Sequence, residues 1–307
     1  MTLHPPEDVA VTGDVAGAPD ATGDAGTAGG LGPAPSGRAG TRGRPPGRLL
    51  RVRGALPVAW RVGLGAAGLV ALVVLWVVAA RQTGSNGTGI AVPSPGQTWS
   101  ALREMQSEGT LLPDTLASAK RMLWGYSISM AIGIVVGVTM GSLPGVEGTL
   151  EAPIGFLRYI PASAMTPLML LWLGIGEAPK VTLIVLGTVF FNVLMVFDVA
   201  RSVPRELIDA ASTLGAGRLR SLTRVILPHS VPGIVDVARI NLAAGWLMLV
   251  VAELLATDEG LAVRVARSAR FRSYDTMFAV FIVFGVIGML SDLALRGLRW
   301  AVARWDR

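Results

Sequence analysis

The chain has 307 residues, of which 51% are hydrophobic and 16% are charged, and its mean hydropathy is +0.55. This composition is too apolar for a soluble domain and predicts a membrane protein. The chain has no cysteine and only two histidines, so disulfides, thiolate metal sites and histidine clusters are excluded. The net charge of +6 comes mainly from arginines beside hydrophobic spans, a pattern that indicates membrane topology rather than nucleic-acid binding.

The first 61 residues differ in composition from the rest. Residues 1–45 are rich in Gly, Ala, Pro and Asp and have almost no large apolar side chains. Such a segment buries too little surface to offset its ordering entropy, so we expect a disordered tail. Residues 46–61 form a basic juxtamembrane segment, expected to lie against anionic lipid at about 1 kcal/mol per basic residue. The first apolar run starts too far from Met1 for a signal peptide.

The remainder, residues 62–307, is expected to form one transmembrane domain of six helices. Each hydrophobic run is long enough to cross or enter a bilayer. Pro161 and Pro167 lie in the third run and predict a broken helix, which is tolerated where protein or water satisfies the freed carbonyls. The predicted fold class is an all-α polytopic membrane protein with spans at residues 61–81, 121–147, 158–176, 181–197, 233–256 and 276–295.

Arginine placement predicts the orientation of these spans. Seven arginines precede the first span and four follow the last, so both termini are expected to be cytoplasmic. The loop at residues 201–232, between the fourth and fifth spans, falls on the same side. One segment conflicts with this topology, because the loop assigned to the outside contains Arg264, Arg267, Arg270 and Arg272.

The loop between the fourth and fifth spans reads as a short amphipathic helix. Pro204 suits a first helical position, and Gly215 supplies a stop. Glu206 and Asp209 lie in the first turns, where the helix dipole favours carboxylates. One apolar face recurs at i, i+3, i+4 and i+7, formed by Leu207, Ala210, Ala211 and Leu214.

A second short helix is expected directly after Gly215. Leu219, Leu222 and Ile226 would share one side of it, and Pro228 would close it. A polar loop that folds into two helices beside the membrane predicts a surface that binds a cytoplasmic partner.

These residues resemble a known signature. Asp209-Ala210-Ala211, with Gly215 four residues later and the ending Val225–Pro228, is similar to the EAA loop of permease subunits of binding-protein-dependent ABC importers. Asp replaces Glu and Val replaces Ile. Further phrases at residues 160–180, 201–216 and 245–255 look like the nitrate/sulfonate/taurine branch, and the resemblance spans about two thirds of the chain.

The resemblance implies a fold, partners and a location. It implies a type I importer permease in a bacterial inner membrane, present as a homodimer with two cytoplasmic ABC ATPase subunits and an extracytoplasmic solute-binding protein. Alternating access would be driven by ATP, and no cofactor, metal or nucleic acid is implied. Residues 201–232 would be the coupling loop, with the ATPase-docking residues Glu206, Leu207, Asp209, Ala210, Ala211, Leu214, Gly215 and Pro228.

The chain is not expected to hydrolyse ATP itself. A phosphate-binding loop needs Gly-x4-Gly-Lys-Ser/Thr, and the two lysines, Lys120 and Lys180, stand in other contexts. The chain is therefore predicted to be a transport subunit rather than an enzyme.

Polar and sulfur-containing residues within the spans are candidates for a translocation pathway. For the methionines, which share helical spacing with Trp172, core packing is the alternative, and for the asparagines it is hydrogen bonding between helices. The candidates are Met165, Met169, Asn192, Asn241 and Trp246.

Two ion pairs are also expected within or beside the spans. Glu253 lies in an apolar run, and Arg264 or Arg267 is its expected partner. Asp236 and Arg239 are expected to pair at i, i+3.

The substrate class remains open at this level. A sulfonate, taurine or nitrate is expected, and a permease of another importer branch, for example for a thiamine-precursor-like solute, is the alternative. An ion-coupled secondary transporter and a membrane scaffold are alternatives from other classes. Secondary transporters tend to place their binding sites at midplane. Here the acidic residues gather at the ends of the spans, which favours the ATP-driven importer.

Overall fold

The computed structural model describes residues 57–85, 92–255 and 258–303. The chain divides into two units, residues 1–61 and residues 62–307, and of the first unit only residues 57–61 are described. The expected disordered tail at residues 1–45 lies outside the described residues, as does most of the basic segment at residues 46–61.

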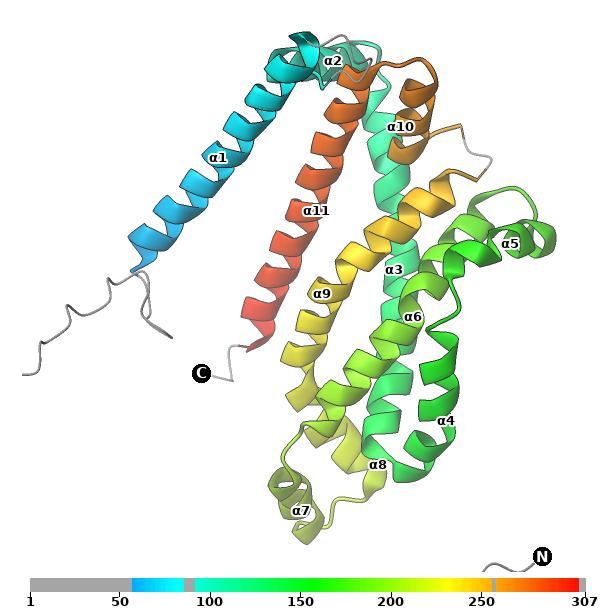
Figure 1. Ribbon diagram of the computed structural model, residues 1–307. Coiled ribbons are helices and arrows are strands. Elements are labelled where there is room, and N and C mark those ends of the chain that lie inside the picture. Colours follow the sequence, from blue (N-terminus) through cyan, green and yellow to red (C-terminus); the bar gives the residue numbers. More distant parts are fainter. Residues whose placement is uncertain (1–56, 86–91, 256–257, 304–307) are drawn as a thin grey trace, which may run out of the picture. The chain divides into compact units, whose positions relative to one another are not determined.

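All regular secondary structure in the described residues is helical (Figure 1). Ser94 caps α2 with a reciprocal pair of hydrogen bonds to Gln97, the arrangement of a capping box. The elements in chain order are α1 (Val58–Ser85), α2 (Pro95–Ser107), α3 (Leu111–Ser142), α4 (Pro144–Leu157), η2 (Ala162–Met165), α5 (Thr166–Leu173), α6 (Glu177–Arg201), α7 (Arg205–Thr213), α8 (Arg218–Ser221), η3 (Leu222–Ile226), α9 (Leu227–Glu253), α10 (Leu261–Arg270) and α11 (Tyr274–Val302).

Five stretches are long and apolar enough to cross a membrane, and they lie on α1, α3, α6, the α8–α9 run and α11. α4 and the segment Ala162–Leu173 are bent by 76° relative to each other, and they form a sixth span if the two are counted as one broken helix. The predicted all-α fold with up to six spans is confirmed, and so is the break near Pro161.

The predicted bounds of the second and third spans were wrong. α3 extends from Leu111 to Ser142, and α4 belongs to the third, broken span. Arg121 and Glu147 were taken as span ends because they are charged. Arg121 instead lies inside α3, where ion pairs with Glu177 and Glu253 allow its burial, and Glu147 pairs with Arg201 at 2.6 Å.

The core is built on close packing of α3 against α6 and of α6 against α9. Every fourth residue on one face of α3 is small, namely Gly125, Ser129, Gly133, Gly137 and Gly141. An added Cβ at Gly137 would lie 2.6 Å from the carbonyl oxygen of Val193 and 2.8 Å from Cβ of Val196. The two backbones are therefore nearly in contact, as is typical of small-residue interfaces in membranes.

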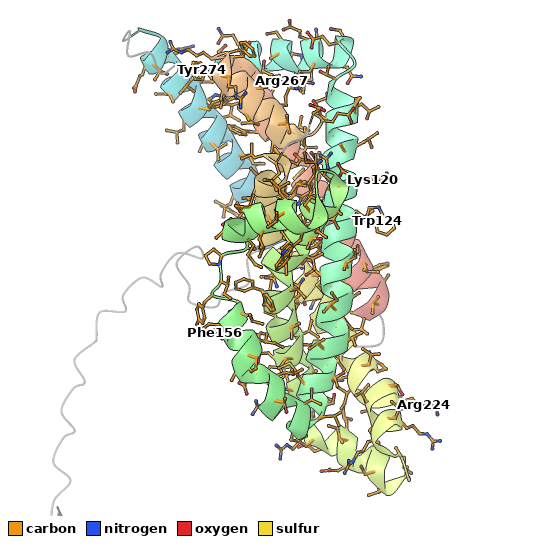
Figure 2. The ribbon with its side chains drawn as sticks, turned by 90° about the vertical axis from the view of Figure 1, so that its right-hand side faces the viewer. Lys120, Trp124, Phe156, Arg224, Arg267 and Tyr274 are labelled. Carbon is orange, nitrogen blue, oxygen red and sulfur yellow. The ribbon has the colours of Figure 1, made fainter. Side chains whose placement is uncertain are left out.

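Within residues 62–307, α7 and α8 lie at one end of the helices, and α2 and α10 lie at the other (Figure 1). Figure 2 shows the same separation, with Arg224 near one end and Arg267 and Tyr274 near the opposite end. The predicted partner-binding loop and the arginine-rich segment that follows α9 are therefore on opposite ends of this unit.

Candidate coupling surface and buried polar clusters

The helix predicted in the polar loop is confirmed as α7. Pro204, predicted at the first helical position, is instead the N-cap, and the helix begins one residue later, at Arg205. Gly215 has φ +79°, and its N–H donates to the carbonyl of Ser212 at 3.0 Å, while the N–H of Ala216 donates to the carbonyl of Ala211 at 2.9 Å. This pair of bonds is a Schellman motif, so the predicted role of Gly215 as the helix end is confirmed.

The two sides of α7 have different surroundings. Ile208 is half-buried and packs against the main hydrophobic core. Leu207 is 42% exposed, Leu214 is 87% exposed, and Ala210 is exposed. Ala211 is half-buried at the edge between the two sides. Among the described residues, α7 is thus anchored by Ile208 and leaves an apolar strip uncovered.

The acidic residues of α7 lie beside this strip. Glu206 and Asp209 are both exposed, and Glu206 is in the first turn. Carboxylates there are favoured by the helix dipole. The free surface of α7 therefore combines an apolar strip with negative charge.

Pro228 does not end a second short helix, and that prediction was wrong. The chain runs from α8 through the π-turn η3 directly into α9, and Pro228 lies in the first turn of α9. A widened turn is a usual accompaniment of proline in a continuous helix, because the ring cannot fit a regular hydrogen-bond ladder. Ile226 is buried, whereas Leu219 is 75% exposed, so the expected one-sided face does not include Leu219.

A cavity of about 600 Å³ separates α7 from the α3–α4 corner. Gly141 and Pro144 line it on one side, and Ile208, Ser212 and Ile226 on the other. α7 therefore faces the α3–α4 corner across this cavity and contacts η3, which leads directly into α9. Such a position allows a displacement of α7 to reach the spans.

The two asparagines proposed for a pathway bond to each other instead of facing an open space. Asn241 Nδ2 donates to Asn192 Oδ1 at 2.8 Å, and Asn192 Nδ2 donates to Ser129 Oγ at 2.8 Å. Thr188 Oγ1 donates to the same Ser129 Oγ at 2.7 Å. This chain of hydrogen bonds joins α3, α6 and α9. Asn192 and Asn241 therefore form hydrogen bonds between helices, the alternative to a pathway role given for them above.

The other pathway candidates are also partly or fully enclosed. Met169 is buried and Met165 is half-buried against the core, as the packing alternative expected, whereas Trp172 is exposed. Trp246 packs edge-on against Phe284, with ring centroids 6.1 Å apart, and its buried indole N–H has no hydrogen-bond partner among the described residues. Trp246 borders an apolar cavity of about 550 Å³ between α3, α9 and α11. A role of these residues in translocation stays a prediction.

Glu253 is fully buried, but its expected partner was wrong. It accepts hydrogen bonds from Arg121 Nη1 at 2.9 Å, Ser118 Oγ at 2.6 Å and the backbone N–H of Ala262 at 2.9 Å. Arg264 pairs instead with Asp114 at 2.7 Å. The prediction was wrong because it chose the arginines nearest to Glu253 along the chain. In the folded protein α3 places Arg121 beside the end of α9.

The expected pair of Asp236 and Arg239 is confirmed, at 3.3 Å. It belongs to a larger group, since Arg239 also contacts Asp292 of α11 at 3.1 Å and Arg299 contacts Asp236 at 2.8 Å. These ion pairs fasten α11 to α9.

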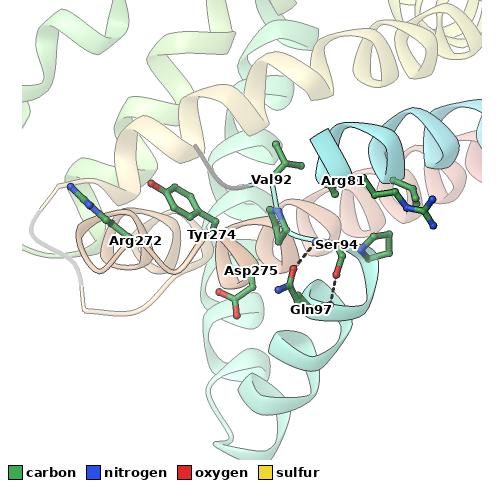
Figure 3. Close-up of a pocket in the computed structure, with 11 residues that line it drawn as sticks. Arg81, Val92, Ser94, Gln97, Arg272, Tyr274 and Asp275 are labelled. Atoms are coloured by element: carbon green, nitrogen blue, oxygen red, sulfur yellow. Dashed lines mark hydrogen bonds between the residues drawn. The ribbon is translucent and has the colours of Figure 1, made fainter. Parts of the chain in front are cut away.

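A further cavity, of about 630 Å³, lies where the end of α1 meets the start of α11 (Figure 3). Its wall includes the Ser94–Gln97 capping box, and Arg81 and Arg272 lie on opposite sides of it. Because the two cations do not converge, this cavity offers no focused site for an anion.

Residues 127–303, more than half of the chain, match the family described as "Binding-protein-dependent transport system inner membrane component". The chain belongs to this family. It is therefore a multi-pass membrane protein and a transport component, and the resemblance inferred from the loop motif is confirmed.

Relatives of this permease carry related names. It is 34% identical to the taurine transport system permease protein TauC of Escherichia coli K12, over 77% of this chain and 86% of that protein. It is 30% identical to the putative aliphatic sulfonates transport permease protein SsuC of the same organism, over 77% of this chain and 89% of that protein. A crystal structure of a bacterial ABC transporter for alginate shares the fold, with a TM-score of 0.56 at 12% identity over 80% of this chain and 97% of that chain.

Sequence reasoning missed one group of charged residues in this permease. Arg121, Glu177 and Lys180 meet at the start of α6. Arg121 had been interpreted only as a span end and Lys180 only as a lysine outside any phosphate-binding loop, and Glu177 had not been singled out. Charged residues in apolar spans are expensive and are functional candidates by default. That signal was present in the sequence.

Proposed function

We propose that this permease imports a small sulfonate, such as taurine or another alkanesulfonate, by alternating access powered by separate ATPase subunits. The names of the relatives support the substrate class. The observation that carries the mechanism is the uncovered apolar strip of α7, held to the core by Ile208.

The ATPase would dock on this strip. Leu207, Ala210 and Leu214 provide apolar contact, and Ala211 allows close approach at its edge. Glu206 and Asp209 would meet basic groups on the ATPase. Because Ile208 and the α3–α4 corner lie behind α7, a rigid-body movement of the ATPase would tilt α3, α4 and α9 together.

The assembly would contain two copies of the permease, two ATPase subunits and an extracytoplasmic solute-binding protein. The family description names dependence on a binding protein. The end with α7 would be cytoplasmic, together with both chain termini, and the end with α10 external. The external arginines weaken this topology less than their number suggests, because Asp114 neutralises Arg264.

The substrate class is tested by uptake into proteoliposomes. The full-length permease, reconstituted with the candidate ATPase and binding protein, should accumulate radiolabelled taurine or ethanesulfonate when ATP is present. Unlabelled sulfonate should compete, and an uncharged solute of similar size should not. Uptake driven by an ion gradient without the ATPase would contradict the proposal and favour a secondary transporter.

A further inference from the structure

Arg121 holds two carboxylates at the end of the helices opposite α7. Its Nε and Nη2 donate to Glu177 Oε2 at 2.6 Å and to Glu177 Oε1 at 2.9 Å, a two-point contact. Its Nη1 donates to Glu253 Oε1 at 2.9 Å. Lys180 Nζ donates to the same Oε1 of Glu177, at 2.8 Å. One carboxylate is thus clasped by a guanidinium and an ammonium at once.

The members of this cluster differ sharply in exposure. The side chains of Arg121 and Lys180 are 7% and 5% exposed, and that of Glu253 is 0% exposed. The side chain of Glu177 is 58% exposed. Glu253 is fixed by Ser118 and by the backbone of α10, whereas Glu177 reaches the two cations from the surface. Glu177 is therefore the member that can leave while the other three stay in place.

Departure of Glu177 would leave a site of defined charge and shape. Arg121 would keep Glu253, but the Nε and Nη2 edge of its guanidinium would be free, and Lys180 would lose the carboxylate it clasps. A buried cation without a partner is unfavourable, so Glu177 leaves readily only when another anion enters. The planar fork of arginine with an adjacent ammonium suits an oxyanion that offers two or more oxygens.

We propose that Arg121 and Lys180 bind the anionic group of the transported solute, and that Glu177 occupies their site while the solute is absent. This inference rests on the proposed function and names the residues that take the sulfonate. Glu177 accepts hydrogen bonds from these cations through its two carboxylate oxygens, and a sulfonate has three oxygens that can accept them in the same way. The exposed side of the site lies at the end opposite α7, where the solute would arrive from outside.

A tethered carboxylate competes with a free anion at an effective concentration in about the millimolar range, so removing its charge should expose the site. The experiment measures binding of radiolabelled ethanesulfonate to the full-length permease in lipid nanodiscs. Glu177→Gln should bind ethanesulfonate at least about tenfold more tightly than the unmodified permease. Adding Lys180→Met to this variant should remove the gain.

A matched control is available at the other end of the molecule. Glu147 also forms an ion pair with an arginine, Arg201, at 2.6 Å and is partly exposed. Glu147→Gln makes the same chemical change away from the site and should leave ethanesulfonate binding unchanged. Ethyltrimethylammonium, a cation of similar size, should gain nothing from Glu177→Gln.

Binding by a folded Glu177→Gln variant that is no tighter than that of the unmodified permease would overturn the inference. An equal gain for ethanesulfonate and ethyltrimethylammonium would overturn it as well. If the unmodified transporter imports sulfonate while Glu177→Gln gains no binding, the assignment of the anion site to Arg121 and Lys180 is rejected and the proposed function is retained. If Glu177→Gln gains ethanesulfonate binding while the transporter imports no sulfonate, the anion site is retained and the proposed substrate class is rejected.

Discussion

Leu214→Asp should abolish ATP-dependent uptake while leaving the permease folded in the membrane. Leu214 is 87% exposed and lies on the uncovered strip of α7, so the chain itself loses little packing when the side chain changes. In the assembled transporter the same position would be buried against the ATPase, where an unpaired carboxylate costs several kcal/mol. We expect uptake to fall at least about a hundredfold, equivalent to about 3 kcal/mol of lost docking free energy.

Thr213→Asp is the matched control for this change. Thr213 is the neighbouring residue on α7, is also exposed, and lies off the apolar strip. It should keep most of the uptake and should co-purify with the ATPase, which Leu214→Asp should not do. Normal co-purification and uptake by Leu214→Asp, at normal membrane levels, would show that the strip is not the docking surface.

Gly137→Ala should be the most damaging small substitution in the spans. Alanine normally stabilises a helix by about 0.5–1 kcal/mol relative to glycine. At Gly137 the sign reverses, because the added Cβ would lie 2.6 Å from the carbonyl oxygen of Val193, and a backbone atom of α6 cannot move aside alone. Overpacking of this kind costs about 1–3 kcal/mol.

The measurement is the thermal midpoint and the yield of the monodisperse permease in detergent, with Gly148→Ala as the control. Gly148 lies in α4, and apart from its own helix backbone and chain neighbours no heavy atom of the described residues lies within 4 Å of the position that its Cβ would take. Gly137→Ala should lower both quantities, and Gly148→Ala should leave them unchanged or raise them. Equal behaviour of the two variants would contradict the close packing of α3 on α6.

Features that depend on neighbouring residues in the sequence were predictable. The i, i+3, i+4, i+7 spacing predicted α7, and a glycine at its end predicted the Schellman motif, because both depend on local hydrogen bonds. Hydrophobic run lengths predicted the number of spans for a similar reason. The ion pair of Asp236 and Arg239 followed from one helical turn.

Features that depend on tertiary partners were not predictable in the same way. Glu253 pairs with Arg121, more than a hundred residues earlier in the chain, and only the packing of α3 beside α9 makes that contact. Arg121 was mistaken for the end of a span because its ion pairs, which allow it to be buried within α3, cannot be seen in the sequence. Pro228 looked like a helix terminator because a π-turn that absorbs a proline has no clear sequence pattern. The small-residue stripe on α3 was visible in the sequence and was missed.

The cytoplasmic position of α7 is the central claim, and cysteine labelling tests it most directly. The chain has no native cysteine, so Ser212→Cys places a single thiol on the exposed surface of α7. A membrane-impermeant thiol reagent should label this variant in inside-out vesicles and should fail to label it in intact cells. Labelling in intact cells, with no further labelling after the membrane is opened, would place α7 outside the cell. That result would contradict its role as the docking surface for a cytoplasmic ATPase.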